Sequence, residues 1–286
     1  MFWENSIAFV SQLYHFIAYN IKKPDMQLEN GMLVISVDVD VGNREIGIIN
    51  KGKNDRNVSS RFSEYRVGEI EEQALPLFVD LFYDFEVPAT FAIRGQLTEV
   101  DTSILKLMLK SKHDVGSHGY YHRDFTKLSY DEAENELHMT SEGMRKFGII
   151  PKSFVFSRNR VGHLDLLEKY GYKCYRGRAG FINDGMYIEK RGKLYDIHPS
   201  VFIGQSVTTT FLKKIINVGI KSKLPLHLWF HLWNFGETRE SMQRSISKVF
   251  FPLFSYAEKK VKSGVLTFET MLSAAKKAEK VFKTIE

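Results

Sequence analysis

Short apolar segments with strand character alternate with longer helical segments along most of this 286-residue chain. Seven of them stand out, namely Met32–Val37, Ala89–Ile93, Val115–His118, Ser153–Phe156, Lys173–Arg176, Leu226–Phe230 and Val265–Phe268. Alternation of this kind predicts a parallel sheet whose crossover helices lie outside it. Because seven or eight strand–helix units fit a closed or nearly closed ring better than an open sheet, we expect an α/β fold built as a β/α barrel with about seven parallel strands.

The helical segments carry start and stop signals of their own. Gly68–Tyr83 contains Pro76, which we expect to begin or kink that helix. Ser129 and Glu132 form a capping-box pattern that opens a helix reaching about Lys146. Further helices are expected over Thr102–Lys112, His163–Tyr170 and Ser245–Val261, with a last helix after the final strand, whereas Gly180–Gly204 is expected to be irregular with short strand-like pieces.

We expect one barrel domain over residues 31–286, preceded by a helical extension over residues 1–30. No linker rich in Ser, Pro or Gly divides the chain. Phe2–Tyr19 lacks the basic start and unbroken apolar core of an export signal, since it contains Glu4, Asn5, Gln12 and His15. An amphipathic helix that caps the fold suits this segment better. No segment approaches a transmembrane span, so we expect a cytoplasmic protein, with peripheral membrane contact left open.

The charge and the cysteine content narrow the chemistry. The formal net charge is +6, and much of the excess lies in lysines near the end of the chain: Lys259, Lys260, Lys262, Lys276, Lys277, Lys280 and Lys283. Glutamates are interspersed among them in a helical pattern, which favours a solvated helix face over a nucleic-acid partner. The one cysteine, Cys174, excludes an intramolecular disulfide. Any transition-metal site must therefore use histidine and carboxylate ligands.

Two carboxylates stand at the end of the first strand segment, in the run ISVDVDV. Side chains at positions i and i+2 of a strand share a face, so Asp38 and Asp40 should point the same way. Like charges this close destabilise each other unless a cation or a proton separates them. The carboxyl ends of barrel strands also carry the chemistry of such folds. The sequence therefore predicts a cation at this end of the barrel.

Two histidines supply ligands for that cation in the stretch SHGYYH. The spacing of His118 and His122 would place both imidazoles on one side of a helical turn. Two histidines and one carboxylate make a catalytic zinc shell that leaves room for water and substrate. Asp40 can provide the carboxylate, which leaves Asp38 beside the metal as a general base for a bound water.

Rival interpretations account for fewer of these residues. A phosphatase of the haloacid-dehalogenase type also opens with Asp-x-Asp, but it needs a later strand ending in an acidic pair to complete a Mg²⁺ site. None of the later strand candidates ends that way, and the same objection applies to a glycosyltransferase that holds a nucleotide sugar. A purely structural, salt-bridged strand end explains the two aspartates and leaves the histidines coincidental.

With these motifs in this order, the chain resembles the polysaccharide deacetylase family, carbohydrate esterases of the nodulation-factor deacetylase type. The resemblance runs from about Met32 to Ala275 and includes the segments PATFAIRGQL and HRDFTKLSYDEAENEL. It implies a distorted β/α barrel and one divalent metal ion. Zn²⁺ is the expected ion, with Co²⁺, Ni²⁺, Mn²⁺ or Fe²⁺ as alternatives. Asp-Val-Asp replaces the family's usual adjacent aspartates and is similar to its Asp-x-Asp subgroup. By this match Asp38 is the general base, and Asp40, His118 and His122 hold the metal.

The resemblance also assigns two further roles. The family's third motif is an arginine near a proline that orients the base; Arg158 is the better match here and Arg160 the alternative, although the proline is missing. His231, after the apolar strand LHLWFHLWNF, is the general acid by resemblance. The acidic partner that the family often gives this histidine has two candidates, Asp184 and Asp196. His227 is expected to lie at the opposite end of its strand, as a core residue.

The implied activity is removal of an N-acetyl group from an amino sugar in a glycan or a glycan precursor, within the synthesis or modification of a surface polysaccharide. Deformylation, hydrolysis of a ureide or cyclic amide, and glycan binding without catalysis are the alternatives. The polar segment Val41–Tyr65 should lie over the active face, either as a surface loop or as a substrate clamp that uses Arg44, Lys51, Lys53 or Arg56. Tyr120, Tyr121, Trp229 and Trp233 lie beside the motif histidines, where they either stack on a sugar ring or pack in the core.

Overall fold

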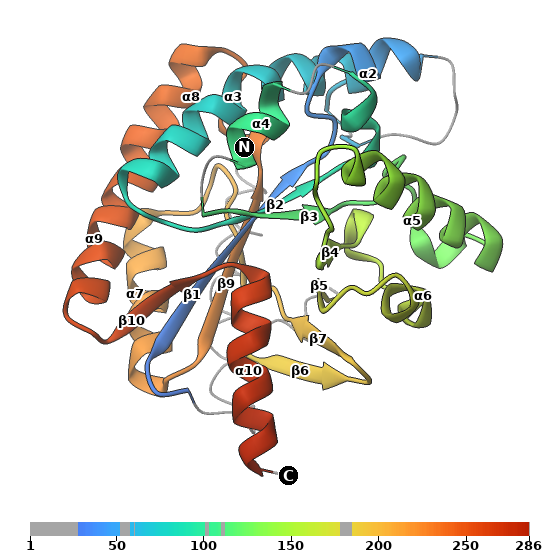
Figure 1. Ribbon diagram of the computed structural model, residues 1–286. Coiled ribbons are helices and arrows are strands. Elements are labelled where there is room, and N and C mark those ends of the chain that lie inside the picture. The colour runs from blue at the N-terminus through green and yellow to red at the C-terminus, as the bar shows by residue number, and fades with distance from the viewer. Residues whose placement is uncertain are drawn as a thin grey trace.

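The computed structural model describes residues 28–51, 58–59, 61–100, 103–109, 112–177 and 185–285. In that part of the chain, ten strands form one curled sheet, shown in Figure 1. Their bounds are β1 Gly31–Val39, β2 Thr90–Ile93, β3 Asp114–Ser117, β4 Ser153–Val155, β5 Cys174–Arg176, β6 Ile188–Arg191, β7 Leu194–Ile197, β8 Val201–Phe202, β9 Pro225–His231 and β10 Leu266–Glu269.

The strand order is β6-β7-β5-β4-β3-β2-β1-β9-β8, and β10 pairs with β1 beside this path. Among the described strands, only β6 and β7 pair antiparallel. One edge of β1 serves two partners, because β10 pairs with its first residues and β2 with its last. The path ends at β6 on one side and at β8 on the other. Among the described strands it does not close into a ring, so the curled sheet forms a half-barrel. The expected distorted α/β barrel is thus confirmed.

The helices lie outside this sheet for the most part. Their bounds are α2 Arg44–Ile49, α3 Glu64–Asp84, α4 Ser103–Leu109, α5 Tyr130–Arg145, α6 Leu164–Lys169, α7 Thr209–Ser222, α8 Arg239–Ser245, α9 Phe251–Lys262 and α10 Met271–Ile285. Figure 1 shows α3, α7, α8 and α9 along one side of the sheet and α5 and α6 along the other. No described helix has the length and apolar character needed to cross a membrane.

The two faces of β1 explain how the interior is organised. Its odd-numbered residues from Leu33 to Val39 are buried in a large apolar cluster with the covering helices. Its even-numbered residues point into the half-barrel, with Met32 and Val34 nearest the amino end, then Ser36, then Asp38. Successive layers of the interior therefore change from apolar to acidic toward the carboxyl ends of the strands.

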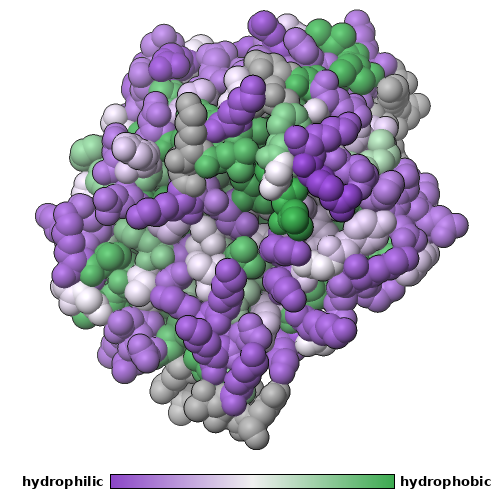
Figure 2. Space-filling model, viewed as in Figure 1, coloured by the Kyte–Doolittle hydropathy of each residue, from purple (hydrophilic) through white to green (hydrophobic). Residues whose placement is uncertain are grey.

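Helix α10 packs against the apolar end of this interior. Ala274, Ala275 and Ala278 lie in one buried cluster with Met32 and Val34. The opposite face of α10 carries the exposed Lys276, Lys277, Lys280 and Lys283, and hydrophilic side chains cover the surface over this helix in Figure 2. This arrangement agrees with the predicted solvated helix face.

The predicted strands are all present, to within one or two residues at their ends. The predicted helices are present too, and Pro76 lies inside α3 rather than at its start. Helices α2, α7 and α8 were not predicted from the sequence. Three further strands, β6 to β8, arise in the stretch expected to be irregular. The extension expected over residues 1–30 lies outside the described residues up to position 27 and stays a prediction.

Candidate active site

Asp38 and Asp40 reach the interior from the carboxyl end of β1, on the same face, as their spacing predicted. The Asp38 side chain is 2 % exposed and that of Asp40 is fully buried. Asp38 lies in register with His231, the last residue of β9, so the neighbouring strand brings an imidazole to the same layer. Two buried carboxylates so close together need compensating positive charge or hydrogen-bond donors.

His118 and His122 follow β3 and meet Asp40 from the other side. Their Nε2 atoms lie 3.4 Å and 3.5 Å from Asp40 Oδ1. The expected helical turn between the two histidines is absent. Gly119 and His122 both have positive φ, and this tight turn brings the two rings to 4.8 Å between centroids. His118 Nδ1 lies 2.7 Å from the Val155 carbonyl oxygen, which requires a proton on Nδ1 and leaves a lone pair on Nε2.

These three residues have the geometry of an open metal site. Asp40 Oδ1 and His118 Nε2 are buried without a hydrogen-bond partner among the described residues. Ligands that lie about 2.1 Å from one tetrahedral ion are about 3.4 Å apart, which matches the separations found here. Three protein ligands leave further coordination positions for water or substrate. Asp40, His118 and His122 therefore form a candidate site for a divalent metal ion.

A second group of three potential ligands shares this region and consists of Asp38, Asp40 and His231. Asp38 is a poor ligand, because both of its oxygens accept hydrogen bonds from one guanidinium. Arg176 Nη1 and Nη2 each lie 2.6 Å from an Asp38 oxygen. Burial alone would raise the pKa of Asp38, but the charge and hydrogen bonds of Arg176 outweigh burial and hold the pKa below its usual value. The first group is the better metal site, and Asp38 stays an ionised carboxylate beside it.

Arg176 has a role at the site that no sequence motif indicated. It is 1 % exposed, ends β5, donates to Asn159 Oδ1 and stacks over the ring of Trp229 at 4.2 Å. Arg158, which we had predicted to orient the base, is exposed and follows β4 in a turn where its φ is 59°. The alternative, Arg160, pairs with Asp124 at 3.0 Å. Of these three arginines, Arg176 is the one whose guanidinium donates two hydrogen bonds to Asp38.

His231 lies above both carboxylates. Its Nε2 is 3.6 Å from Asp38 Oδ2 and 3.9 Å from Asp40 Oδ2, and its side chain is 20 % exposed. The carboxylates beside this imidazole are therefore those of β1. Asp196, one predicted partner, lies on β7 with its carboxylate against Gly177, and burial raises its pKa to about 7. Asp184, the other, lies outside the described residues.

Two buried glutamates hold the backbone that carries the metal-ligand candidates. Glu71 of α3 accepts hydrogen bonds from the backbone N–H groups of residues 40, 41 and 42, at 2.5 to 3.1 Å. Glu136 of α5 does the same for the N–H groups of Tyr120 and Tyr121, at 2.7 and 2.8 Å. Each covering helix thus fixes one of the two loops from which ligands project.

Below the site, His227 occupies the middle of β9 rather than the opposite end of the barrel. It is 1 % exposed, as predicted for a core residue. Its Nδ1 donates to the Ile197 carbonyl oxygen at 2.9 Å, and its Nε2 accepts from Ser36 Oγ at 2.8 Å. Ser36 Oγ also accepts from Arg176 at 3.2 Å. A buried polar layer therefore supports the acidic layer above it.

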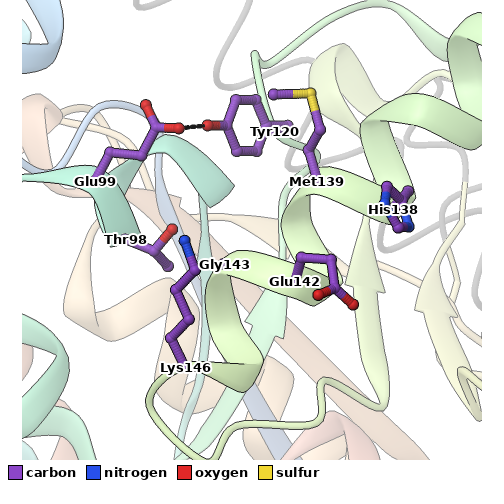
Figure 3. A pocket seen from close by; sticks show the side chains of 8 residues that line it. All are labelled: Thr98, Glu99, Tyr120, His138, Met139, Glu142, Gly143 and Lys146. Atoms are coloured by element: carbon purple, nitrogen blue, oxygen red, sulfur yellow. Dashed lines mark hydrogen bonds between the residues drawn. The ribbon is translucent and has the colours of Figure 1, made fainter.

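Some of the aromatic residues near the histidines contact the candidate site, and Tyr120 does not. Trp233 stacks on His231, and Phe202 and Trp229 contact the same imidazole, with ring centroids 5.0 to 5.6 Å apart. Tyr120 instead faces away from the metal site. Its hydroxyl contacts Glu99 in a separate cavity of about 190 Å³ between the 3₁₀ segment Gly95–Glu99 and α5, as Figure 3 shows. Stacking of Tyr120 on a substrate at the metal site is therefore ruled out in this arrangement.

The segment Val41–Tyr65 is described in part. It contains α2, and Arg44 at the start of α2 lies 3.7 Å from Glu72. Lys51 is exposed, whereas Lys53 and Arg56 lie outside the described residues. A clamp function for this segment stays a prediction.

Comparison with known proteins indicates a family. The model of the polysaccharide deacetylase family matches residues 55–174. An uncharacterized 30.6 kDa protein of Geobacillus stearothermophilus is 29 % identical over 139 residues, which cover 44 % of this chain and 51 % of that protein. A peptidoglycan deacetylase of Helicobacter pylori is 27 % identical over 105 residues, 36 % of each chain. The chain thus spans about half or less of the length of these relatives.

A solved structure extends the comparison to nearly the whole chain. A polysaccharide deacetylase homologue from Mycobacterium smegmatis superposes with a TM-score of 0.67 at 14 % identity, covering 92 % of this chain and 95 % of its own. At that identity the similarity shows the fold, which is the half-barrel described above.

Proposed function

Because this chain belongs to the polysaccharide deacetylase family, we propose that it hydrolyses the N-acetyl group of an amino sugar in a glycan or a glycan precursor. The observation that carries this proposal is the meeting of an open Asp40–His118–His122 site with Asp38, which Arg176 keeps ionised. A relative named as a peptidoglycan deacetylase supports an N-acetylated sugar polymer as the substrate class.

Asp40, His118 and His122 would hold the ion, and Zn²⁺ is the ion that this donor set suits best. When bound, a divalent ion supplies a Lewis acid that polarises the acetyl carbonyl and lowers the pKa of a bound water. The role of this chain's residues is to fix the ligand atoms: the His118 tautomer is set by Val155, and the Asp40 backbone is held by Glu71.

Asp38 acts as the general base in this proposal. Its carboxylate takes a proton from the water as that water attacks the acetyl carbonyl. Arg176 holds both Asp38 oxygens in place and keeps the side chain deprotonated at neutral pH. The guanidinium only donates hydrogen bonds and takes no part in the proton transfer.

His231 acts as the general acid. Amide hydrolysis releases an amine, which leaves readily only after its nitrogen has been protonated. The imidazole is partly exposed above the two carboxylates, so it can meet the substrate nitrogen. Its neighbour Phe202 is exposed and can offer an aromatic face to a sugar ring.

The direct test is acetate and free-amine release from N-acetylated sugars and peptidoglycan fragments, with wild type compared with Asp38→Asn. The expected fall in turnover is about 10²- to 10⁴-fold, since a general base contributes that much to a rate. Asp80→Asn on the exposed side of α3 is the matched control and should turn over like wild type. Equal turnover by Asp38→Asn and wild type would refute the base, and release of formate or urea from other amides without acetate would refute the deacetylase.

A further inference from the structure

The two oxygens of the Asp40 carboxylate have different surroundings. Oδ1 faces His118 and His122 and has no hydrogen-bond partner among the described residues. Oδ2 accepts a hydrogen bond from the indole N–H of Trp233, with 2.7 Å between Nε1 and Oδ2. That length is typical of a bond to an ionised acceptor. One oxygen of this carboxylate is therefore available to a metal ion, and the other already accepts a hydrogen bond.

An indole N–H is suited to this task because it can only donate. It has no lone pair with which to bind a metal, and it does not ionise in the pH range of the enzyme. A lysine or arginine at the same place would add a full positive charge next to a cation. Trp233 thus lowers the negative charge available on Oδ2 without competing for the ion, and it leaves Oδ1 as the ligand atom.

The same ring also contacts His231. Trp233 lies nearly parallel to the imidazole, with an interplanar angle of 29° and 5.0 Å between centroids. Phe62 packs edge-on against the same indole, with 6.4 Å between ring centroids. The short 3₁₀ segment Leu232–Phe235, directly after β9, presents Trp233 to both groups. One side chain therefore connects a metal-ligand candidate with the general-acid candidate.

We propose that Trp233 is a positioning residue: its N–H holds Asp40 so that this residue binds a divalent metal ion through Oδ1 alone, and its ring holds His231 above the site. This inference rests on the proposed function for the identity of the site and goes beyond it in assigning the coordination mode to a residue outside the metal shell. Loss of such a hydrogen-bond partner typically weakens metal binding by about 10- to 100-fold.

The test measures Co²⁺ binding to chelator-treated protein, by competition with a chromogenic chelator and by the visible absorption of the bound ion. Trp233→Phe keeps an aromatic ring and removes the N–H. Replacement of Trp233 by benzothienylalanine keeps the full bicyclic shape and removes only the N–H, so it decides the matter if the phenylalanine variant folds poorly. Phe62→Leu is the matched control, since it removes a neighbour of the indole and leaves the N–H in place.

We expect both Trp233 variants to bind Co²⁺ about 10- to 100-fold more weakly than wild type, with an altered visible spectrum, and Phe62→Leu to match wild type. Unchanged affinity and spectrum in the Trp233 variants would overturn the inference. So would an equal loss in Phe62→Leu, because packing would then explain the effect. A wild-type protein that binds Co²⁺ but releases no acetate would contradict the proposed function and leave this inference standing.

Discussion

Asp38 and Asp40 have the same residue type, lie two positions apart on one strand and have different partners. Both oxygens of Asp38 accept hydrogen bonds from one guanidinium, whereas Asp40 faces two imidazoles and an indole. The sequence predicted their shared face and the convergence of His118 with them, because all three follow from strand periodicity and strand ends. Arg176 also ends a predicted strand, but which strand ends meet across the barrel cannot be read from spacing. The family resemblance favoured Arg158 instead.

Arg176 offers a pH test of this difference at the scale of one residue. In Arg176→Gln the opposing charge is lost, so the pKa of Asp38 should rise, by about 1 to 3 units for a carboxylate that loses an adjacent arginine. A base must be deprotonated to act, so the acidic limb of the kcat/KM profile should move to higher pH. Arg158→Gln should leave that limb in place. A shift in the Arg158 variant and none in the Arg176 variant would restore our original assignment.

At the scale of elements, the candidate site depends on helices that contribute no ligand. Glu71 of α3 and Glu136 of α5 bind the backbone N–H groups of the loops after β1 and β3. The helices themselves were predictable from their patterns, and the predicted Ser129–Glu132 capping box of α5 is present. The inward glutamates were not, because a single charged residue on an apolar helix face gives no sign of what it meets.

Glu71→Gln tests this support. Burial and the nearby Asp40 carboxylate raise the pKa of Glu71 to about 8, whereas the three N–H donors favour its ionised form. An amide offers one acceptor oxygen where the carboxylate offers two, so at least one buried N–H loses its partner, at a cost of about 1 to 3 kcal/mol in the free energy of unfolding.

The measurement is urea unfolding of the metal-free protein, followed by Zn²⁺ titration. Zn²⁺ affinity should fall as well, because the backbone of Asp40 loses a support. Glu72→Gln, the next residue of α3, is the control and should change stability by less than about 1 kcal/mol, as expected for its partly exposed pair with Arg44. Equal effects of the two variants would show that Glu71 has no special role.

At the scale of the whole molecule, the half-barrel is filled in layers: the alanines of α10, then a polar layer with His227, then the acidic site. The alternation of strands and helices predicted this architecture. The order of strands and the packing of α10 against the end of the interior depend on contacts between distant segments, which sequence patterns do not show. The short strands β6 to β8 were foreseen only as strand-like pieces without bounds, because two to four residues carry too little pattern to delimit a strand.

The buried polar layer makes stability depend on pH. Burial first, and then the charge of Arg176, lower the pKa of His227 from 6.5 to about 3. Below pH 6.5 the unfolded chain takes up a proton that the folded protein does not, so stability is lost as pH falls from 6.5 toward 3. Between pH 7 and pH 5 this residue should remove about 2 kcal/mol from the free energy of unfolding.

Urea unfolding of metal-free protein at the two pH values measures this loss. In His227→Gln, whose side chain does not titrate, the difference between pH 7 and pH 5 should be smaller by the same amount. An unchanged pH dependence in that variant would place the acid sensitivity elsewhere in the molecule.

The account depends most on a single divalent ion held by Asp40, His118 and His122, and calorimetric titration of chelator-treated protein with Zn²⁺ tests it most directly. We expect one ion per chain in wild type, one ion per chain in Asp38→Asn, and no measurable binding in His118→Ala. If His118→Ala bound Zn²⁺ as tightly as wild type, or if Asp38→Asn lost the ion, the metal would not be where we place it.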